Sequence, residues 1–172
     1  MDHLNKNKYI VFVLIGIVLA ALIFPWIPRP ISLSLDGILW EDTTEEAIPV
    51  HVTLEGQLQR KTLDARIIVL RNAEISLSAY PEVAEPFSLG IRKEFDRYND
   101  VYYGFLSGPL FYEDGRTDSL AIGDMWVSED WKFFVIRPHL GEAEGQQIMS
   151  FPAETLSEAQ DLWVLLKEKA TG

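Results

Sequence analysis

Residues 49–58 read Pro-Val-His-Val-Thr-Leu-Glu-Gly-Gln-Leu, and apolar and polar side chains alternate along them. In an extended chain Val50, Val52 and Leu54 fall on one side, and residues such as His51 fall on the other. This alternation is typical of a β-strand with one face in a core and the other in water. The segment therefore predicts an antiparallel sheet.

The flanking sequence extends this pattern in both directions. Residues 65–70 are almost continuously apolar, as in a strand covered on both faces. Residues 80–100 are ambiguous, because prolines interrupt them and 91–98 fits either a short helix or a strand and turn. Further strands are expected at residues 31–36, 73–79, 101–112, 119–127, 131–137 and 146–151.

The last predicted element is a helix over residues 155–169. Thr155 stands three residues before Glu158, which is the capping-box pattern of a helix N-terminus. Trp163 and Leu166 belong to an apolar stripe that would pack on the sheet. The sequence thus predicts a mostly antiparallel β domain, either a sandwich or a partly open barrel, with one C-terminal α-helix.

A different pattern precedes this domain. Residues 9–27 contain 17 apolar residues in 19 and no charged residue. As a helix the run would span about 28 Å, close to the hydrocarbon thickness of a bilayer. Tyr9 and Trp26 lie near its ends, where aromatic side chains anchor helices at the membrane interface. We therefore expect residues 9–27 to contact lipid.

The flanking charges predict the orientation. Two positive charges, Lys6 and Lys8, precede the run, whereas one, Arg29, follows it. Because the more positive flank stays in the cytoplasm, the positive-inside rule predicts a cytoplasmic N-terminus. A cleaved signal peptide is the alternative, although the apolar run is longer than such peptides need. The expected organisation is a cytoplasmic tail at 1–8, a transmembrane helix at 9–28, a linker with the first strand at 29–48, and an extracytoplasmic domain at 49–172.

Composition excludes several classes of protein. The chain of 172 residues has no cysteine, which rules out thiol catalysis and cysteine-based metal centres. Its net charge is −11, and residues 31–172 alone carry −13, which argues against nucleic acid as a partner. We expect this charge to keep the domain soluble and to repel an anionic bilayer. The lack of cysteines and of glycosylation sites favours a bacterial plasma membrane.

Acidic residues gather in two clusters that could attract a cation. Neither cluster has the spacing of a calcium-binding loop, so we interpret them as a solvated linker and a hairpin turn, and no metal or cofactor is expected. The clusters are Glu41, Asp42, Glu45 and Glu46 in one case, and Glu113, Asp114 and Asp118 in the other.

Catalytic motifs are scarce. The sequence has neither a nucleophile elbow nor a phosphate-binding glycine loop. His51 lies on the polar face of a predicted strand, and His139 follows a proline in a predicted loop. An envelope hydrolase that uses carboxylates with His51 or His139 remains an alternative, and a histidine and a carboxylate would then have to meet in a cleft.

The main expectation is a non-enzymatic binding or scaffold role at the outer face of the membrane, alongside another envelope protein. Aromatic residues crowd the predicted strand 101–112, and an exposed aromatic patch would form a binding surface. The third alternative is a barrel that binds a lipid or small ligand in an apolar cavity. The candidate surface residues are Tyr102, Tyr103, Phe105, Phe111 and Tyr112.

Overall fold

The computed structural model describes residues 2–42, 45–62, 66–79, 87–89, 93–111, 117–139 and 146–171. The helical elements are α1 (Asp2–Ile23), the short 3-10 helix η1 (Phe24–Trp26) and α2 (Leu156–Thr171). The strands are β1 (Arg29–Glu41), β2 (Ala47–Arg60), β3 (Ile67–Leu77), β4 (Phe87–Leu89), β5 (Lys93–Tyr98), β6 (Val101–Phe111), β7 (Thr117–Ser128), β8 (Phe134–Pro138) and β9 (Gln147–Phe151).

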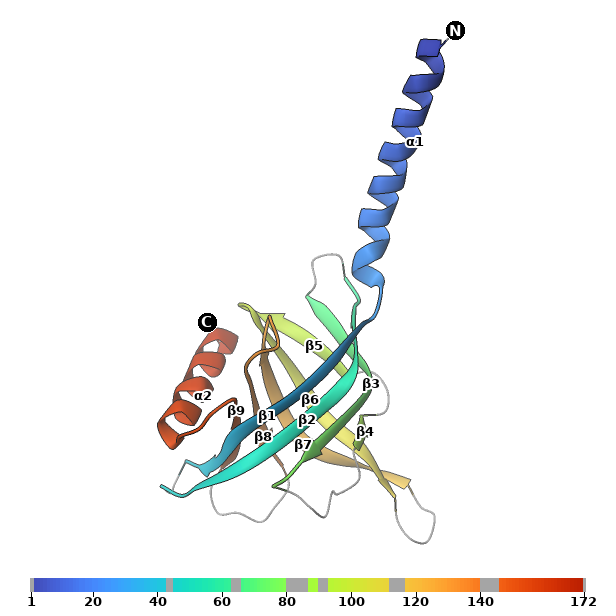
Figure 1. Cartoon of the computed structure of the whole chain (residues 1–172). Coiled ribbons are helices and arrows are strands. Elements are labelled where there is room, and N and C mark those ends of the chain that lie inside the picture. Colours follow the sequence, from blue (N-terminus) through green and yellow to red (C-terminus); the bar gives the residue numbers. More distant parts are fainter. Residues whose placement is uncertain are drawn as a thin grey trace.

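The described strands form a closed antiparallel barrel (Figure 1). Most strands pair with the next strand along the chain; the exception is β4, which adds a short segment beside β3, while β3 itself pairs with β5 in the ring. The ring closes because β9 pairs with β1, from Ile38 opposite Ser150 to Glu41 opposite Gln147. The antiparallel β domain with a C-terminal helix is confirmed, but its strands form one closed ring instead of two stacked sheets or a partly open barrel.

The alternation at β2 sorts its side chains as the sequence predicts. Val50, Val52 and Leu54 point into the barrel and are buried, whereas His51 and Glu55 face outward. The barrel interior is filled by large apolar side chains, among which Tyr102, Phe134, Phe151, Leu54 and Met125 are fully buried. Packing inside the ring therefore supplies the main hydrophobic core.

A second core lies outside the ring, beneath α2. Ala159, Trp163 and Leu166 of α2 pack against outward-facing side chains that include Trp40 and Trp126. The capping interaction at Thr155 is confirmed, because Thr155 Oγ1 accepts a 3.3 Å hydrogen bond from the Glu158 amide. The helix thus covers the outer face of the barrel near the seam between the first and last strands.

The structure resolves one ambiguous segment and moves the start of one predicted strand. The segment 91–98 becomes β5 over Lys93–Tyr98, so its strand reading holds over the described residues. Trp131 was expected to begin a strand, but it lies in the β7–β8 turn with a φ of 60°. Its amide donates to the Ser128 carbonyl oxygen, and its side chain folds back toward Tyr102. A tight turn therefore places an indole ring at the end of the barrel.

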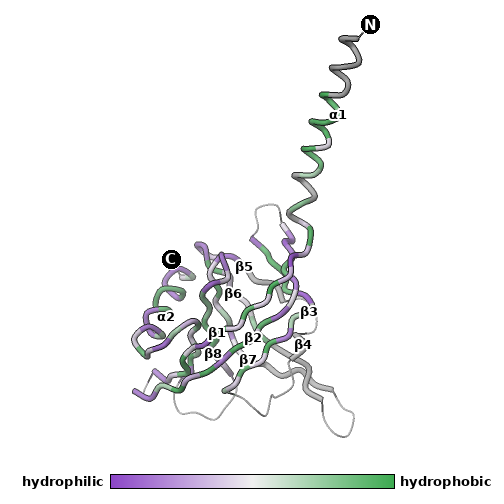
Figure 2. Tube along the Cα trace, viewed as in Figure 1, coloured by the Kyte–Doolittle hydropathy of each residue, from purple (hydrophilic) through white to green (hydrophobic). Residues whose placement is uncertain are grey.

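Helix α1 extends away from the barrel (Figure 1). Its described side chains from Ile10 to Leu19 are largely apolar and exposed, and Figure 2 shows this stretch in the hydrophobic colour. Within the described part of the chain, no helix meets both the length and the hydropathy required for a membrane crossing. Trp26 is 40% exposed and its carbonyl oxygen accepts a hydrogen bond from Gln59, whereas the Tyr9 side chain lies outside the described set.

Candidate functional site

The alternation of β6 divides the aromatic residues singled out from the sequence. Tyr102 points into the barrel, is almost completely buried and lies 6.5 Å from the ring of Trp131. Tyr103 and Phe105 point outward, and Phe105 is 44% exposed. Phe111 ends β6, but its side chain and the whole of Tyr112 lie outside the described residues. Tyr103 and Phe105 are therefore the members of the set that the structure places on a surface.

An acidic side chain lies beneath these two aromatic residues. Asp124 of β7 stands opposite Phe105 in the strand register, and its side chain is only 6% exposed. Tyr103 Oη donates a 2.8 Å hydrogen bond to Asp124 Oδ1, and the Arg137 guanidinium of β8 donates to Asp124 Oδ2. His139 Nε2 lies 3.2 Å from the same Oδ2 atom. Side chains from β6, from β8 and from the residue that follows β8 thus surround one carboxylate.

The charge of Asp124 is stabilised by these contacts. Burial alone raises the pKa of Asp124, but the hydrogen bonds from Arg137, Tyr103 and His139 outweigh burial and leave the pKa below its ordinary value. The pKa of Tyr103 is raised by burial and by its hydrogen bond to Asp124. Asp124 is therefore ionised at neutral pH, and Tyr103 holds its proton as the donor.

Aromatic rings fix the geometry around this carboxylate. The Arg137 guanidinium lies over the Trp126 ring at 5.4 Å from its centroid, and Tyr103 packs against the same ring at 5.3 Å. Trp126 in turn meets Trp163 of α2 edge-on at 5.1 Å. The ring of His139 lies 5.7 Å from that of Phe105. The cluster is thus anchored to α2 on one side and open to solvent at Phe105 on the other.

We call this region the β6–β8 surface, and define it by Tyr103, Phe105, Asp124, Arg137 and His139. It combines an arginine with aromatic side chains, which are residue types enriched at energetically important positions of protein interfaces. The charge of the Asp124 carboxylate is balanced by Arg137. Asp124 and Arg137 were not singled out from the sequence. The available signal was one carboxylate within the otherwise apolar strand 120–127.

The second histidine belongs to a different region of the barrel. His51 Nδ1 lies 2.7 Å from Asp36 Oδ1, and His51 Nε2 lies 3.1 Å from Ser34 Oγ. These contacts follow the serine–histidine–aspartate order of a catalytic triad. A shallow groove of about 330 Å³, lined in part by Asp36, His51 and Ser78, runs beside them. The Asp36 side chain is 89% exposed, however, so water screens its interaction with the imidazole.

The two histidines therefore have separate carboxylate partners, Asp36 for His51 and Asp124 for His139. Among the described residues, no group of three or more histidine and acidic side chains is arranged to hold a metal ion. Of the two acidic clusters, Glu113 and Asp114 lie outside the described residues. The chain matches no known family model, no curated protein and no solved structure.

Proposed function

We propose that the chain is a single-pass, membrane-anchored binding protein whose barrel lies outside the membrane and binds a partner envelope protein through the β6–β8 surface. The observation that carries this proposal is the fixed charge network of Asp124 and Arg137 directly beside the exposed Phe105. Such a surface needs little rearrangement to bind, because its arginine is held in place before the partner arrives.

The anchoring part of the proposal draws on residues 9–27. Their apolar side chains have the composition of a lipid-contacting helix, and those described in α1 are exposed, away from the barrel. Lys6 and Lys8 favour a cytoplasmic N-terminus. Alkaline carbonate extraction tests insertion, and an alkaline phosphatase fusion after Gly172 tests orientation. An extractable protein or an inactive fusion would refute this part.

The binding part is tested by purification of the full chain from gently solubilised membranes. A partner that co-purifies with the unaltered chain in a fixed molar ratio should be lost from Phe105→Ala. Ile48→Ala is the matched control, because Ile48 is an exposed apolar residue on β2, away from the proposed surface. Equal retention of the partner by both variants would exclude the β6–β8 surface as its binding site.

A second candidate function is acyl transfer at Ser34, and the hydrogen-bond order from Ser34 through His51 to Asp36 favours it. In that reaction His51 would accept the Ser34 proton while Asp36 orients the imidazole. A fluorophosphonate probe should then label the protein, and Ser34→Ala should abolish labelling. Ser32→Ala is the control, because Ser32 is exposed on the same face of β1. Absence of labelling in the unaltered chain would eliminate this candidate.

A further inference from the structure

One end of the barrel has a cavity with a mixed lining. The cavity measures about 160 Å³ and is lined by Ile27, Arg29, Arg60, Tyr102, Glu129 and Trp131, among others. We call it the mouth cavity. Its residues come from the start of β1, the end of β2, the start of β6 and the β7–β8 turn, which the antiparallel topology brings to one end of the ring.

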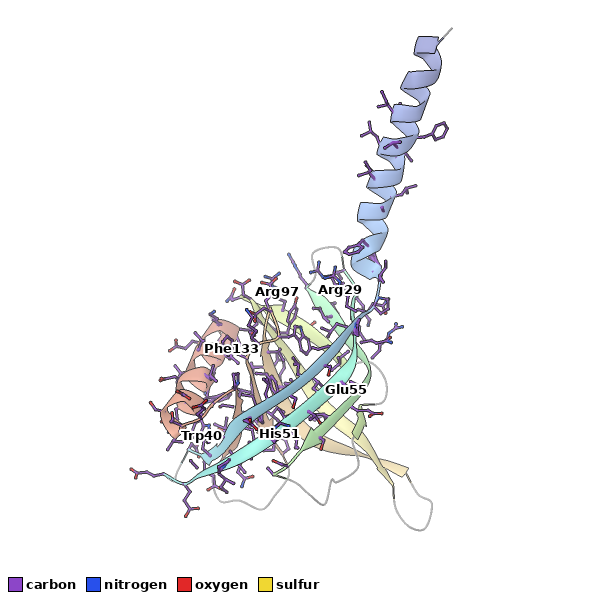
Figure 3. All side chains as sticks on the ribbon, viewed as in Figure 1. Arg29, Trp40, His51, Glu55, Arg97 and Phe133 are labelled. Atoms are coloured by element: carbon purple, nitrogen blue, oxygen red, sulfur yellow. The ribbon has the colours of Figure 1, made fainter. Side chains whose placement is uncertain are left out.

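This is the end of the barrel from which α1 emerges. Gln59 Nε2 donates a 3.2 Å hydrogen bond to the carbonyl oxygen of Trp26, so η1 is joined to β2 beside the cavity. Figure 3 labels Arg29 and Arg97 at this end, whereas Trp40 and His51 lie farther along the barrel. If α1 spans a bilayer, the mouth cavity therefore faces the lipid headgroups.

Two arginines give the mouth cavity a cationic rim. Arg29 stacks over the ring of Phe24, 5.1 Å from its centroid. Among the described residues, neither Arg29 nor Arg60 forms an ion pair. Glu129 also lines the cavity, and Arg97 Nη2 lies 2.9 Å from its carboxylate and 2.5 Å from that of Asp100, so one guanidinium is shared by two carboxylates. Arg29, Arg60 and Arg97 against Glu129 and Asp100 still leave one net positive charge in this group. The cavity thus presents positive charge within a strongly acidic chain.

The distribution of charge along the barrel reinforces this contrast. The turn between β1 and β2 lies at the opposite end and carries Glu41, Asp42, Glu45 and Glu46. The −13 charge of residues 31–172 predicts uniform repulsion from an anionic bilayer. This expectation does not describe the end of the barrel nearest α1. A barrel with this asymmetry would turn its arginines, not its acidic turn, toward anionic lipid.

The inner wall of the mouth cavity is apolar and aromatic. Tyr102 and Trp131 lie side by side there, and Leu58 and Ile68 complete the wall. Two further aromatic side chains, Tyr98 and Phe133, are exposed in or beside turns at the same end of the barrel. Aromatic side chains favour the membrane interface. At about 160 Å³ the cavity is below the ~300–1,000 Å³ of drug-sized pockets, so it suits a headgroup but not a whole lipid.

We propose that the mouth cavity binds the phosphate-bearing headgroup of an anionic membrane lipid, with Arg29 and Arg60 contacting the phosphate and the aromatic wall contacting the glycerol. This proposal rests on the proposed anchoring by α1, which brings the cavity to the bilayer surface. It adds a specific partner for the barrel: one lipid molecule at the rim, bound apart from any protein on the β6–β8 surface.

Native mass spectrometry of the full chain in detergent micelles tests the proposal. The protein is titrated with dioleoyl phosphatidylglycerol, which is anionic, or with dioleoyl phosphatidylcholine, which is zwitterionic. We expect one phosphatidylglycerol molecule to bind selectively. The double variant Arg29→Ala/Arg60→Ala should weaken this binding roughly 25-fold, since each arginine near an anionic headgroup contributes about five-fold.

Two control variants keep the result interpretable. Arg71→Ala removes an exposed cation of β3 outside the cavity lining and should leave binding unchanged. Arg29→Lys/Arg60→Lys retains the charge and should keep most of the affinity, which separates charge loss from misfolding. Equal binding of the two lipids by the unaltered chain, or an equal loss in Arg71→Ala, would overturn the proposal.

The source of the phosphate is tested in the same experiment. Excess inorganic phosphate should not displace phosphatidylglycerol, because it cannot contact the aromatic wall. Full displacement would identify a site for free phosphate and refute the lipid as its ligand. Carbonate extraction tests the membrane insertion of α1 independently. Loss of insertion with intact lipid selectivity in micelles would refute the anchor alone. Intact insertion without lipid selectivity would refute the lipid site alone.

Discussion

Tyr103 of β6 reaches diagonally across the strand pair to Asp124 of β7, and its hydroxyl donates a 2.8 Å hydrogen bond to the carboxylate. Arg137 approaches the same carboxylate from β8. Three adjacent strands are therefore joined by side chains on the outer face of the barrel, in addition to their backbone ladder. This link makes Asp124 important for stability as well as for the shape of the proposed binding surface.

Asp124→Asn should destabilise the barrel by about 2–3 kcal/mol, because the substitution leaves the partly buried Arg137 guanidinium without its counter-charge. Tyr103→Phe, which removes one hydrogen bond, should cost about 1 kcal/mol. Urea unfolding followed by far-UV circular dichroism measures both values. Asp161→Asn on the exposed face of α2 is the control and should change stability by less than about 0.5 kcal/mol. Equal stability of the Asp124→Asn variant and the control would contradict the proposed role of the pair.

The contribution of Asp124 should depend on pH. Its pKa in the folded chain lies below the unfolded value of about 3.9, so the charged form stabilises the fold above that pH. This stabilisation is lost as the pH falls through the lower, folded-state pKa. The stability difference between the unaltered chain and Asp124→Asn should thus be full at about pH 7 and should shrink progressively as the pH falls below the unfolded pKa of about 3.9. Unfolding curves at several pH values measure it, and a difference that grows in acid would reverse the assigned sign.

Docking of α2 should depend on Trp163. Its indole packs edge-on against Trp126 and is nearly buried, so Trp163→Ala should cost about 3–5 kcal/mol. Val164→Ala changes the neighbouring exposed side chain and should cost less than about 0.5 kcal/mol. Hydrogen exchange of the α2 amides, measured alongside urea unfolding, would show whether the helix detaches. Unchanged protection in Trp163→Ala would argue against this docking contact.

Gly37 should not tolerate a larger side chain. A Cβ atom at this position would overlap the Ser150 carbonyl oxygen and the Phe151 ring, both on β9. Gly37→Ala should therefore destabilise the barrel by about 1–3 kcal/mol through overpacking at the seam. Gly16→Ala is the matched control, because nothing lies within 4 Å of a Cβ atom there. Comparable melting temperatures for the two variants would show that the seam can adjust.

Phe105→Ala should leave stability almost unchanged, because the side chain is 44% exposed. An unchanged melting temperature together with loss of the co-purified partner would identify Phe105 as an interface residue. A large fall in melting temperature would instead assign it a structural role.

Local patterns in the sequence were sufficient for much of the fold. The alternation of Val50, Val52 and Leu54 identified a strand and its buried face, and Thr155 with Glu158 located the start of α2. Each of these features depends on residues that are close together in the chain.

Features that depend on distant residues were not predictable in the same way. Closure of the ring joins Glu41 to Gln147, and no local periodicity reports such a pairing. The position of Trp131 depends on a left-handed backbone conformation, which bulky residues rarely adopt. Tyr102 and Tyr103 were both surface candidates, although adjacent residues of a strand point to opposite faces. Which of the two faces is inside depends on closure of the ring, and the barrel turns Tyr102 inward and Tyr103 outward.

Closure by the last strand also sets an order of events during synthesis. β1 pairs with β2 early, but its other edge meets β9 only after β9, which ends 91 residues after β2, has left the ribosome. Until then one edge of the nascent sheet remains open to wrong pairing with another chain. The slow step of folding should accordingly be the late capture of β9 beside β1, completed as α2 settles over the seam.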